Sequence, residues 1–279
     1  MWAAEKSRAN PLVPLPATIS AVRELTIDVN LFQVQFGEGG GFPYRPGQFA
    51  FLSAFGVGEA PFSITSLNDE GGPMEFAIRR VGTVSTALHD MEPGSVLGVR
   101  GPFGNGFPLD TFKGKNLVII GGGIGLAPLR PIIKNALVHR DDYGEVVVIY
   151  GARTHQDLVF ASEFEDWAAV PGVRLELTVD REGPGWDGRV ALVPAVIKEL
   201  QPTVENAVAI ICGPPIMIRF VLAELKAQGF ENHQIVTTLE SKMKCGMGKC
   251  ARCNIGEKYV CQDGPVFTFD QISGFLEQI

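Results

Sequence analysis

The sequence predicts an antiparallel β-barrel of Greek-key type, then a doubly wound α/β domain with a parallel sheet, then a short cysteine-rich segment. Three observations predict this division. Residues 17–112 hold short strands of alternating polarity separated by turn residues. Residues 113–239 alternate continuously apolar strands with helix-length segments. Residues 240–279 hold four of the five cysteines and no pattern long enough for a core of their own, and residues 1–16 form an expected N-terminal arm.

The composition is that of an ordinary globular protein and limits the possible partners. Apolar residues make up 46% and charged residues 20% of the chain, which is too hydrophobic for disorder. The net charge of −7 disfavours a general affinity for nucleic acid or anionic membranes, because both require clustered positive charge. The N-terminus lacks the apolar core of a signal peptide, and no apolar stretch approaches the roughly 20 residues that span a bilayer. We therefore expect a cytoplasmic protein without direct membrane insertion.

In the first part, alternating polarity predicts strands, and glycine or proline marks the turns between them. Turn residues such as Gly39–Gly41, Pro46–Gly47 and Pro93–Gly94 separate the segments. A short helix is expected over residues 85–91, after Gly82, because hydroxyl residues there can cap it. The expected strands are residues 18–25, 29–36, 47–55, 74–81 and 95–101.

In the second part, apolar strands alternate with amphipathic helices, which indicates a parallel sheet covered on both faces. The pattern begins after residues 113–115 and ends near Leu239. The expected strands are residues 116–122, 145–151, 173–180 and 207–213, and the expected helices are residues 127–140, 160–170, 191–201 and 215–229.

The cysteines of the C-terminal segment have the spacing of a metal centre. The spacing C-x4-C-x2-C-x7-C begins with the ligand pattern of plant-type ferredoxins, which favours a 2Fe-2S cluster. Gly246 and Gly248 can adopt positive φ, so that backbone amides turn toward the sulfur atoms. A structural zinc site or unliganded thiols are the alternatives; zinc favours paired short spacings, and the chain has one such pair. The expected ligands are Cys245, Cys250, Cys253 and Cys261.

A glycine-rich turn follows the first strand of the α/β part. A buried strand that runs through glycines into a helix directs backbone amides and a helix N-terminus at an anion, which suits a nucleotide. The pattern is G-x-G-x-x-P, a departure from the dinucleotide fingerprint, and tight packing alone is the competing explanation. The next strand ends at Arg153, without the acidic residue that would bind a ribose hydroxyl. The candidate residues are Gly121, Gly123, Gly125 and Pro128.

A second turn, Cys212-Gly213-Pro214, lies at the C-terminal end of another apolar strand. Ligands of open α/β sheets bind outside these strand ends, so this turn and the glycine-rich turn are expected to face one crevice. The alternative is that Cys212 is a small buried side chain that serves packing alone.

Two elements of the barrel part are candidates for a flat, phosphorylated cofactor. Pro61-Phe62-Ser63 combines an aromatic ring with a hydroxyl, and Gly82-Thr83-Val84-Ser85 begins the expected short helix, where amides can hold a pyrophosphate. Arg79 and Arg80 precede the second element. A core phenylalanine and a solvated arginine pair are the alternatives.

Together these motifs resemble the ferredoxin-NADP reductase superfamily over nearly the whole chain. The runs GEAPFSITS, GVRGPFGNGFP, CGPPIMI and MKCGMGKCARCNIGEKYVCQDGPVF are most similar to gamma subunits of sulfhydrogenases and cytochrome-c3-type hydrogenases. A more distant resemblance links the chain to electron-transfer subunits of dihydroorotate dehydrogenase and to one of the subunits of anaerobic sulfite reductase.

The resemblance implies that FAD binds the barrel. The superfamily motif R-x-Y-S/T aligns with residues 60–63, so Phe62 would stack on the isoalloxazine ring and Ser63 would bond near its N5 atom. Ala60 replaces the arginine that usually meets the pyrophosphate, and Arg79 or Arg80 would supply that charge instead.

The resemblance also implies that NAD(P) binds the α/β part. The turn from Gly121 to Pro128 would hold the dinucleotide pyrophosphate, and Cys212 with Gly213 and Pro214 would approach the nicotinamide ring. The form of the dinucleotide stays open. Arg153 and Arg181 can meet a 2′-phosphate, whereas Asp180 would repel one.

These expectations combine into an electron-transfer subunit, with Ser63 and Cys212 at the site of hydride transfer. NAD(P)H would exchange hydride with FAD, and single electrons would pass through the cluster to or from a partner subunit of a hydrogenase-like or sulfur-metabolising complex. The alternatives are a stand-alone reductase that feeds an oxygenase or soluble carrier, and a zinc-stapled nucleotide-binding redox sensor. Only about forty residues follow Leu239, fewer than a domain needs, so the segment is expected to pack on the core and face a partner.

Overall fold

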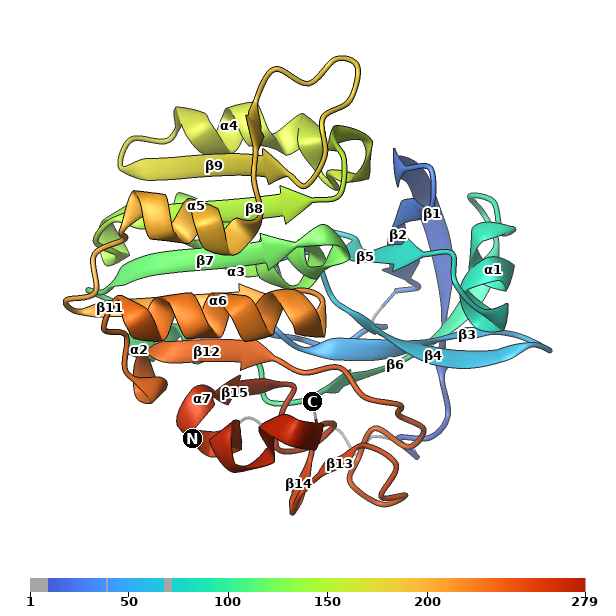
Figure 1. Ribbon diagram of the computed structural model, residues 1–279. Coiled ribbons are helices and arrows are strands. Elements are labelled where there is room, and N and C mark those ends of the chain that lie inside the picture. The colour runs from blue at the N-terminus through green and yellow to red at the C-terminus, as the bar shows by residue number, and fades with distance from the viewer. Residues whose placement is uncertain (1–9, 39, 68–71, 279) are drawn as a thin grey trace.

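The computed structural model describes residues 10–38, 40–67 and 72–278, so residues 1–9 of the expected N-terminal arm lie outside the described residues. Two sheets dominate the chain and lie side by side (Figure 1). One is antiparallel and comes from the first part of the sequence, and the other is mostly parallel and comes from the second. No helix within the described ranges is long and apolar enough to cross a bilayer.

Among the described residues, the antiparallel sheet has six strands in the order β4-β3-β6-β1-β2-β5, so β6 returns to lie beside β1 in a Greek-key connection. The edge strands β4 and β5 approach each other, and the Thr65 amide donates to the Glu75 carbonyl at 2.9 Å, which curls the sheet toward a barrel. Apolar residues from all six strands fill its interior. The strands are β1 (Leu15–Thr26), β2 (Val29–Phe36), β3 (Phe49–Ala54), β4 (Gly58–Ser63), β5 (Met74–Arg79) and β6 (Val96–Phe103), and helix α1 (Thr83–His89) follows β5.

Strand β4 is absent from the strands that the sequence predicts. Its residues Gly58, Glu59, Ala60 and Pro61 have low strand propensity, and proline removes a backbone donor from a ladder. The structure tolerates Pro61 because β4 is an edge strand, paired with β3 alone within the part of the chain that the structure describes. The predicted barrel is confirmed, with one strand more than the pattern indicated.

The second sheet has, in the described ranges, seven strands in the order β10-β9-β8-β7-β11-β12-β15, and the first six are parallel. Helices α5 and α6 cover one face and α3 and α4 the other, so the doubly wound prediction is confirmed (Figure 1). The elements are α2 (Leu109–Phe112), β7 (Asn116–Gly122), α3 (Leu126–Val138), β8 (Val146–Ala152), α4 (Phe164–Ala169), β9 (Val173–Val179), β10 (Arg189–Val190), α5 (Val193–Leu200), β11 (Ala207–Cys212), α6 (Pro215–Ala227) and β12 (Ile235–Thr238).

The cysteine segment packs on both larger parts. Its strand β15 (Val266–Thr268) adds to the edge of the second sheet by antiparallel pairing with β12. Cys253 and Cys261 belong to a core cluster that also contains Phe49 and Phe51 of the barrel. The segment therefore shares the cores of its neighbours, as its shortness predicted. Its other elements are β13 (Asn254–Ile255), β14 (Lys258–Tyr259), α7 (Phe269–Ile272) and the 3-10 helix η6 (Ser273–Gln278).

Candidate functional site

The glycine-rich turn and the Cys212 turn meet at the point where the strand order of the parallel sheet reverses. Strands β7 and β11 are neighbours, with Gly121 opposite Cys212. The chain continues from β7 to β8 on one side and from β11 to β12 on the other, which makes this a topological switch point. The structure confirms that both turns face one crevice.

Close packing between the two turns explains Gly125. A methyl group on Gly125 would lie 2.5 Å from the Cys212 carbonyl oxygen, a separation that Cβ atoms do not reach. Gly123, by contrast, has open space around its Cα and a φ of 54°. The packing explanation therefore holds for Gly125, whereas Gly123 faces the crevice.

A cavity of about 610 Å³ opens beside this switch point. Its volume falls in the range of small-molecule sites. Four residues of the sequence prediction for the dinucleotide or its phosphates line it, together with one arginine of the barrel: Gly123, Arg153, Asp180, Pro214 and Arg79. Apolar side chains that sequence reasoning missed form much of the remaining wall: Leu192, Val193, Pro194, Ile216, Met217 and Phe220. Of these, Leu192, Ile216 and Phe220 are large, apolar and more than half exposed, which is the signal of a binding wall in the folded chain.

Several predicted residues do not line the cavity. Gly121, Gly125 and Pro128 are buried beside it, and Arg181 is not among the lining residues. Cys212 is also buried, and burial raises the pKa of its thiol to about 12. The thiol is therefore neutral near pH 7.

Two charged side chains that line the cavity are relevant to the choice between NAD and NADP. Asp180 follows β9 and lines the cavity, and burial raises its pKa while the charges of Arg181 and Arg153 oppose the shift. Arg153 pairs with Asp157 at 3.1 Å and its side chain is 71% exposed. The cavity thus presents a carboxylate together with an arginine that already has a partner.

The barrel brings the predicted flavin motif to the end of its edge strand. Pro61, Phe62 and Ser63 close β4 and are half-buried, and Phe62 packs against the barrel core. Arg79 closes β5, lies 3.1 Å from Asp28 and also lines the cavity. The structure therefore brings Arg79 to the crevice between the two sheets.

The predicted phosphate segment forms the first turn of α1. The Ser85 hydroxyl accepts hydrogen bonds from the amides of Val81 and Gly82, at 3.0 and 2.9 Å, and donates to the Gly82 carbonyl. Ser85 therefore shapes the turn, while Thr83 and Val84 stand at its more exposed side. Arg80, next to this turn, pairs with Asp90 at 2.9 Å.

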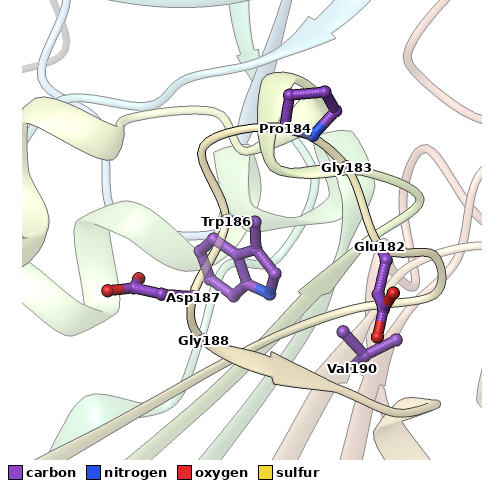
Figure 2. A pocket seen from close by; sticks show the side chains of 7 residues that line it. All are labelled: Glu182, Gly183, Pro184, Trp186, Asp187, Gly188 and Val190. Carbon is purple, nitrogen blue, oxygen red and sulfur yellow. The ribbon is translucent and has the colours of Figure 1, made fainter.

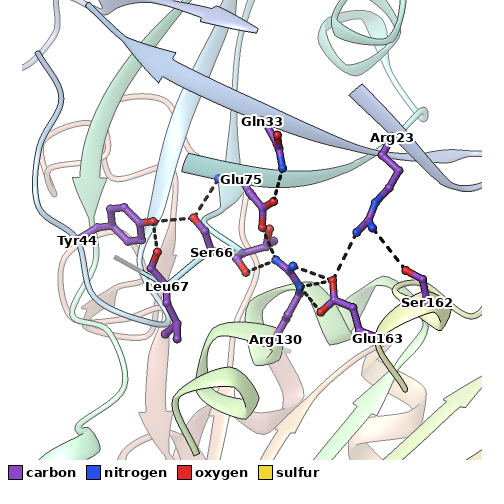
Figure 3. A network of polar contacts seen from close by, with 10 residues as sticks. Arg23, Gln33, Tyr44, Ser66, Leu67, Glu75, Arg130, Ser162 and Glu163 are labelled. Carbon is purple, nitrogen blue, oxygen red and sulfur yellow. Dashed lines mark hydrogen bonds and ion pairs between the residues drawn. The ribbon is translucent and has the colours of Figure 1, made fainter. Parts of the chain in front are cut away.

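A buried arginine joins helix α3 to the barrel (Figure 3). Arg130 of α3 pairs with Glu75 of β5 at 2.5 Å and with Glu163 at 2.7 Å, and it donates to the Thr65 carbonyl at 2.9 Å. Its side chain is 4% exposed. Glu163 also forms an ion pair with the exposed Arg23 of β1, at 3.4 Å. The helix that follows the glycine-rich turn is thus fixed to the barrel just after its flavin motif.

The four cysteine thiols lie close enough to influence one another's titration. Cys253 and Cys245 act on the pKa of Cys261, and Cys250 acts on that of Cys245. Cys253 and Cys261 are buried, whereas Cys250 is exposed. Across the described ranges, no three side chains of His, Cys, Asp or Glu gather as they would around a single metal ion.

Backbone amides turn toward these sulfur atoms. The Gly248 amide donates to Cys261 Sγ at 3.1 Å and the Met247 amide to Cys245 Sγ at 3.4 Å. Gly246 and Gly248 have φ values of 78° and 71°, as the sequence predicted. Burial raises the pKa of Cys245, but the backbone amides outweigh it and lower the value to about 7. The donor set therefore fits a group that takes thiolate ligands.

A second cavity, of about 480 Å³, lies in the loop between β9 and β10 (Figure 2). Trp186 stands within the curve of this loop and stacks on His155, with ring centroids 6.4 Å apart. Its Nε1 donates to the Arg189 carbonyl at 3.0 Å. These contacts fix the loop that follows Asp180 and Arg181.

Each of the three parts of the chain matches a known protein family. Residues 16–107 match the oxidoreductase FAD-binding domain, and residues 119–223 match the oxidoreductase NAD-binding domain. Residues 240–273 match the iron-sulfur cluster binding domain of dihydroorotate dehydrogenase B. The gamma subunit of sulfhydrogenase 1 from Pyrococcus furiosus is 39% identical over 94% of this chain and 93% of its own length. The chain belongs to the ferredoxin-NADP-reductase-like family of FAD- and NAD-binding oxidoreductases.

Other members of this family extend the comparison. A probable electron-transfer subunit of dihydroorotate dehydrogenase B from Thermococcus kodakarensis is 32% identical over 93% of this chain and 98% of its own. Among solved structures, a chain of an NADH-dependent reduced ferredoxin-NADP oxidoreductase that performs flavin-based electron bifurcation is 25% identical, with a TM-score of 0.75. That match covers 94% of this chain and 93% of the other. The chain is thus an oxidoreductase with FAD-binding, NAD-binding and iron-sulfur-binding parts in that order.

Proposed function

We propose that this chain is an electron-transfer subunit that exchanges hydride with NAD(H) and passes single electrons to or from a partner subunit. The observation that carries the proposal is that the barrel contacts both the cavity and the cysteine segment. Arg79 of the barrel lines the cavity at the switch point, and Phe51 of the barrel shares a core with Cys253 of the cysteine segment. A flavin on the barrel would therefore have a dinucleotide on one side and the cysteines on the other.

The residues of the site suit this order of cofactors. Phe62 offers a ring face for the flavin, Ser63 a hydroxyl near its reactive nitrogen, and Arg79 a positive charge for phosphate. A nicotinamide carries two electrons as hydride, a flavin accepts both and releases them singly, and an iron-sulfur cluster takes one at a time. Gly123 and Pro214 would hold the dinucleotide beside the flavin. The neutral, buried Cys212 would pack beneath that turn and would not act as a base.

The spacing of the cysteines supports a 2Fe-2S cluster. In such a cluster each of two irons takes two thiolates, and the spacing C-x4-C-x2-C-x7-C supplies four, beginning with the plant-type ferredoxin pattern. A zinc site instead favours paired short spacings, of which the chain has one. The amides aimed at Cys245 and Cys261 would stabilise the charge of the bound cluster.

The position of Asp180 supports NAD over NADP. A carboxylate at the wall of the cavity suits a ribose hydroxyl and repels a 2′-phosphate. Arg153, which lines the cavity near the C-terminal end of β8, is engaged by Asp157. We therefore assign NADH as the preferred dinucleotide.

A partner subunit is supported by the exposure of Cys250 beside Lys249 and Arg252. The relatives named above are subunits of sulfhydrogenase and of dihydroorotate dehydrogenase B. Because the cysteine segment is built into the cores of the other parts, its exposed thiol would face a docked protein. A hydrogenase-like or sulfur-metabolising complex is the assembly that we propose.

Anaerobic purification tests the proposal. We expect one FAD, two irons and two acid-labile sulfides per chain, and NADH should bleach the flavin and then the cluster. A Cys253→Ser variant should lose most of the cluster signal and keep NADH-dependent flavin bleaching. Zinc without sulfide would refute the cluster, and a lone monomer that is fully active with a small soluble acceptor would refute the partner. Purification of the native protein with whatever accompanies it identifies the complex.

A further inference from the structure

Arg100 is a buried charged residue that binds the strand of the flavin motif. It lies in β6 and its side chain is 3% exposed. Its guanidinium donates two hydrogen bonds to the carboxylate of Glu59 in β4, from Nε to Oε2 at 2.8 Å and from Nη2 to Oε1 at 2.5 Å. Glu59 directly precedes residues 60–63. A two-point grip of this kind fixes both position and orientation.

The same guanidinium also holds the backbone of the cysteine segment. Nη2 donates to the Lys244 carbonyl at 2.6 Å and Nη1 to the Cys245 carbonyl at 2.8 Å. These partners lie more than 140 residues further along the chain. Four bonds use most of the five N–H donors of a guanidinium, and a lysine, with a single charged nitrogen, cannot reproduce that fork.

Two aromatic rings complete the support under this part of the segment. The Arg100 guanidinium carbon lies 4.0 Å from the ring centre of Phe51 and 5.3 Å from that of Phe103. Gly246 lies on the same rings, since a Cβ on it would be 3.0 Å from Phe51 and 3.1 Å from Phe103. The backbone from Lys244 to Gly246 thus rests on a surface made by the barrel.

The strand register places this surface on the face of β4 that carries Ser63, whereas Phe62 lies on the opposite face, against the barrel core. Phe51 of β3 is opposite Arg100 on one side and Pro61 on the other. Opposite residues share a face of a sheet, and so do alternate residues along one strand. Glu59, Pro61 and Ser63 therefore share the face of Arg100, and Ser63 is about 13 Å along β4 from Glu59 at the usual rise per residue.

We propose that Arg100 is a positioning residue that fixes the first cysteine of the cluster segment relative to the flavin. It does so by binding the carbonyls of Lys244 and Cys245 to Glu59, on the strand that ends in the flavin motif. This inference rests on the proposed function for its assignment of flavin and cluster. It adds the residue that sets the separation of the two cofactors.

The test compares Arg100→Met, Arg100→Lys and Glu59→Gln with the unaltered holoprotein. The first readout is hydrogen exchange of the amides of Met247 and Lys249, which should quicken about tenfold or more in Arg100→Met. The second is stopped-flow absorption after mixing with NADH. Flavin bleaching should keep its rate, whereas cluster bleaching should slow about tenfold. Arg100→Lys should resemble Arg100→Met because it keeps the charge and loses the fork.

Further comparisons make each outcome decisive. Arg219→Met, at an exposed position of α6, is the matched control and should change neither readout. Glu59→Gln keeps the carbonyl bonds of Arg100 and should give a smaller change in the same direction. Unchanged exchange and cluster reduction in Arg100→Met would overturn the proposal. So would loss of flavin from that variant, because it would make Arg100 a general core residue. Absence of iron from the unaltered protein would refute the proposed function and leave the exchange comparison intact.

Discussion

The guanidinium of Arg130 lies 2.5 Å from the carboxylate of Glu75, and this contact ties the helix after the nucleotide turn to the barrel. Arg130 sits in the second turn of α3, and Glu75 lies in β5 at the edge of the barrel. The Thr65 carbonyl, two residues beyond Ser63, binds the same arginine at 2.9 Å. The relative position of the flavin motif and the nucleotide turn therefore depends on one buried cation.

Loss of this cation should destabilise the protein. Arg130→Met leaves the Glu75 carboxylate without its ion-pair partner and Glu163 with Arg23 alone, and breaking a buried pair costs about 3–5 kcal/mol of unfolding free energy. Chemical denaturation of the holoprotein, followed by flavin fluorescence, measures the change. Arg23→Met is the control, because its ion pair with Glu163 is half-exposed and such pairs contribute about 1 kcal/mol or less. Equal losses in the two variants would contradict the role of Arg130.

Glu75 should make this stability depend on pH. Burial acts to raise its pKa, but the charge and hydrogen bond of Arg130 outweigh it, so the pKa in the folded protein lies below its ordinary value of 4.5. The unfolded chain then binds the proton more readily. The stabilisation from Glu75 is complete above pH 4.5 and is lost as the pH falls through the folded pKa. Denaturation midpoints between pH 3 and 7 should show a steeper acid loss in the unaltered protein than in Glu75→Gln, and parallel curves would refute this.

Local sequence patterns predict most of this fold and the composition of its sites. Continuous apolar runs predict β7, β8 and β11, and alternating polarity predicts β1 and β2, because a buried face leaves its period in the sequence. Strand β4 could not be predicted because its residues have low strand propensity, and it forms through its pairing with β3. Strand β15 escaped because three residues are too short to show a period.

Contacts between distant residues could not be predicted from the sequence. Nothing in the local sequence distinguishes Arg79, which reaches the cavity, from Arg80, which pairs with Asp90. Arg100 and Cys245 are 145 residues apart, and only the docking of the segment on the barrel brings them together. Gly125 is a candidate nucleotide contact in the sequence, and its close packing against the Cys212 carbonyl is visible only in the fold.

Asp180 should decide between the two dinucleotides. Asp180→Asn removes the charge that would repel a 2′-phosphate, so the kcat/KM ratio for NADPH over NADH should rise about tenfold, which corresponds to about 1.4 kcal/mol of transition-state binding. Steady-state reduction of ferricyanide with each dinucleotide measures the ratio. Glu182→Gln, a change of charge in the adjoining loop, is the control. An unchanged ratio in Asp180→Asn would show that the carboxylate does not face the ribose.

Small redox ions should reveal where electrons leave the chain. Between Glu240 and Cys261 there are five basic and two acidic side chains, in a chain of net charge −7. Lys244, Lys249 and Arg252 are exposed, as is Cys250. An exit at Cys250 should attract anionic ferricyanide and repel cationic hexaammineruthenium(III), over the roughly 10 Å that charge reaches at 0.1 M salt. NADH-dependent reduction of ferricyanide should therefore fall as salt rises, and reduction of the ruthenium complex should increase.

Neutralising the charges at this exit tests its position directly. The triple variant with Lys244→Gln, Lys249→Gln and Arg252→Gln should reduce ferricyanide several-fold more slowly and lose most of the salt dependence, because surface charges act mainly on association rates. The same three changes should have little effect in a Cys253→Ser background, where the proposed cluster is absent and only the flavin can reduce the ions. An equal effect in both backgrounds would mean that electrons leave from the flavin. The exposed Cys250 would then have no part in their exit.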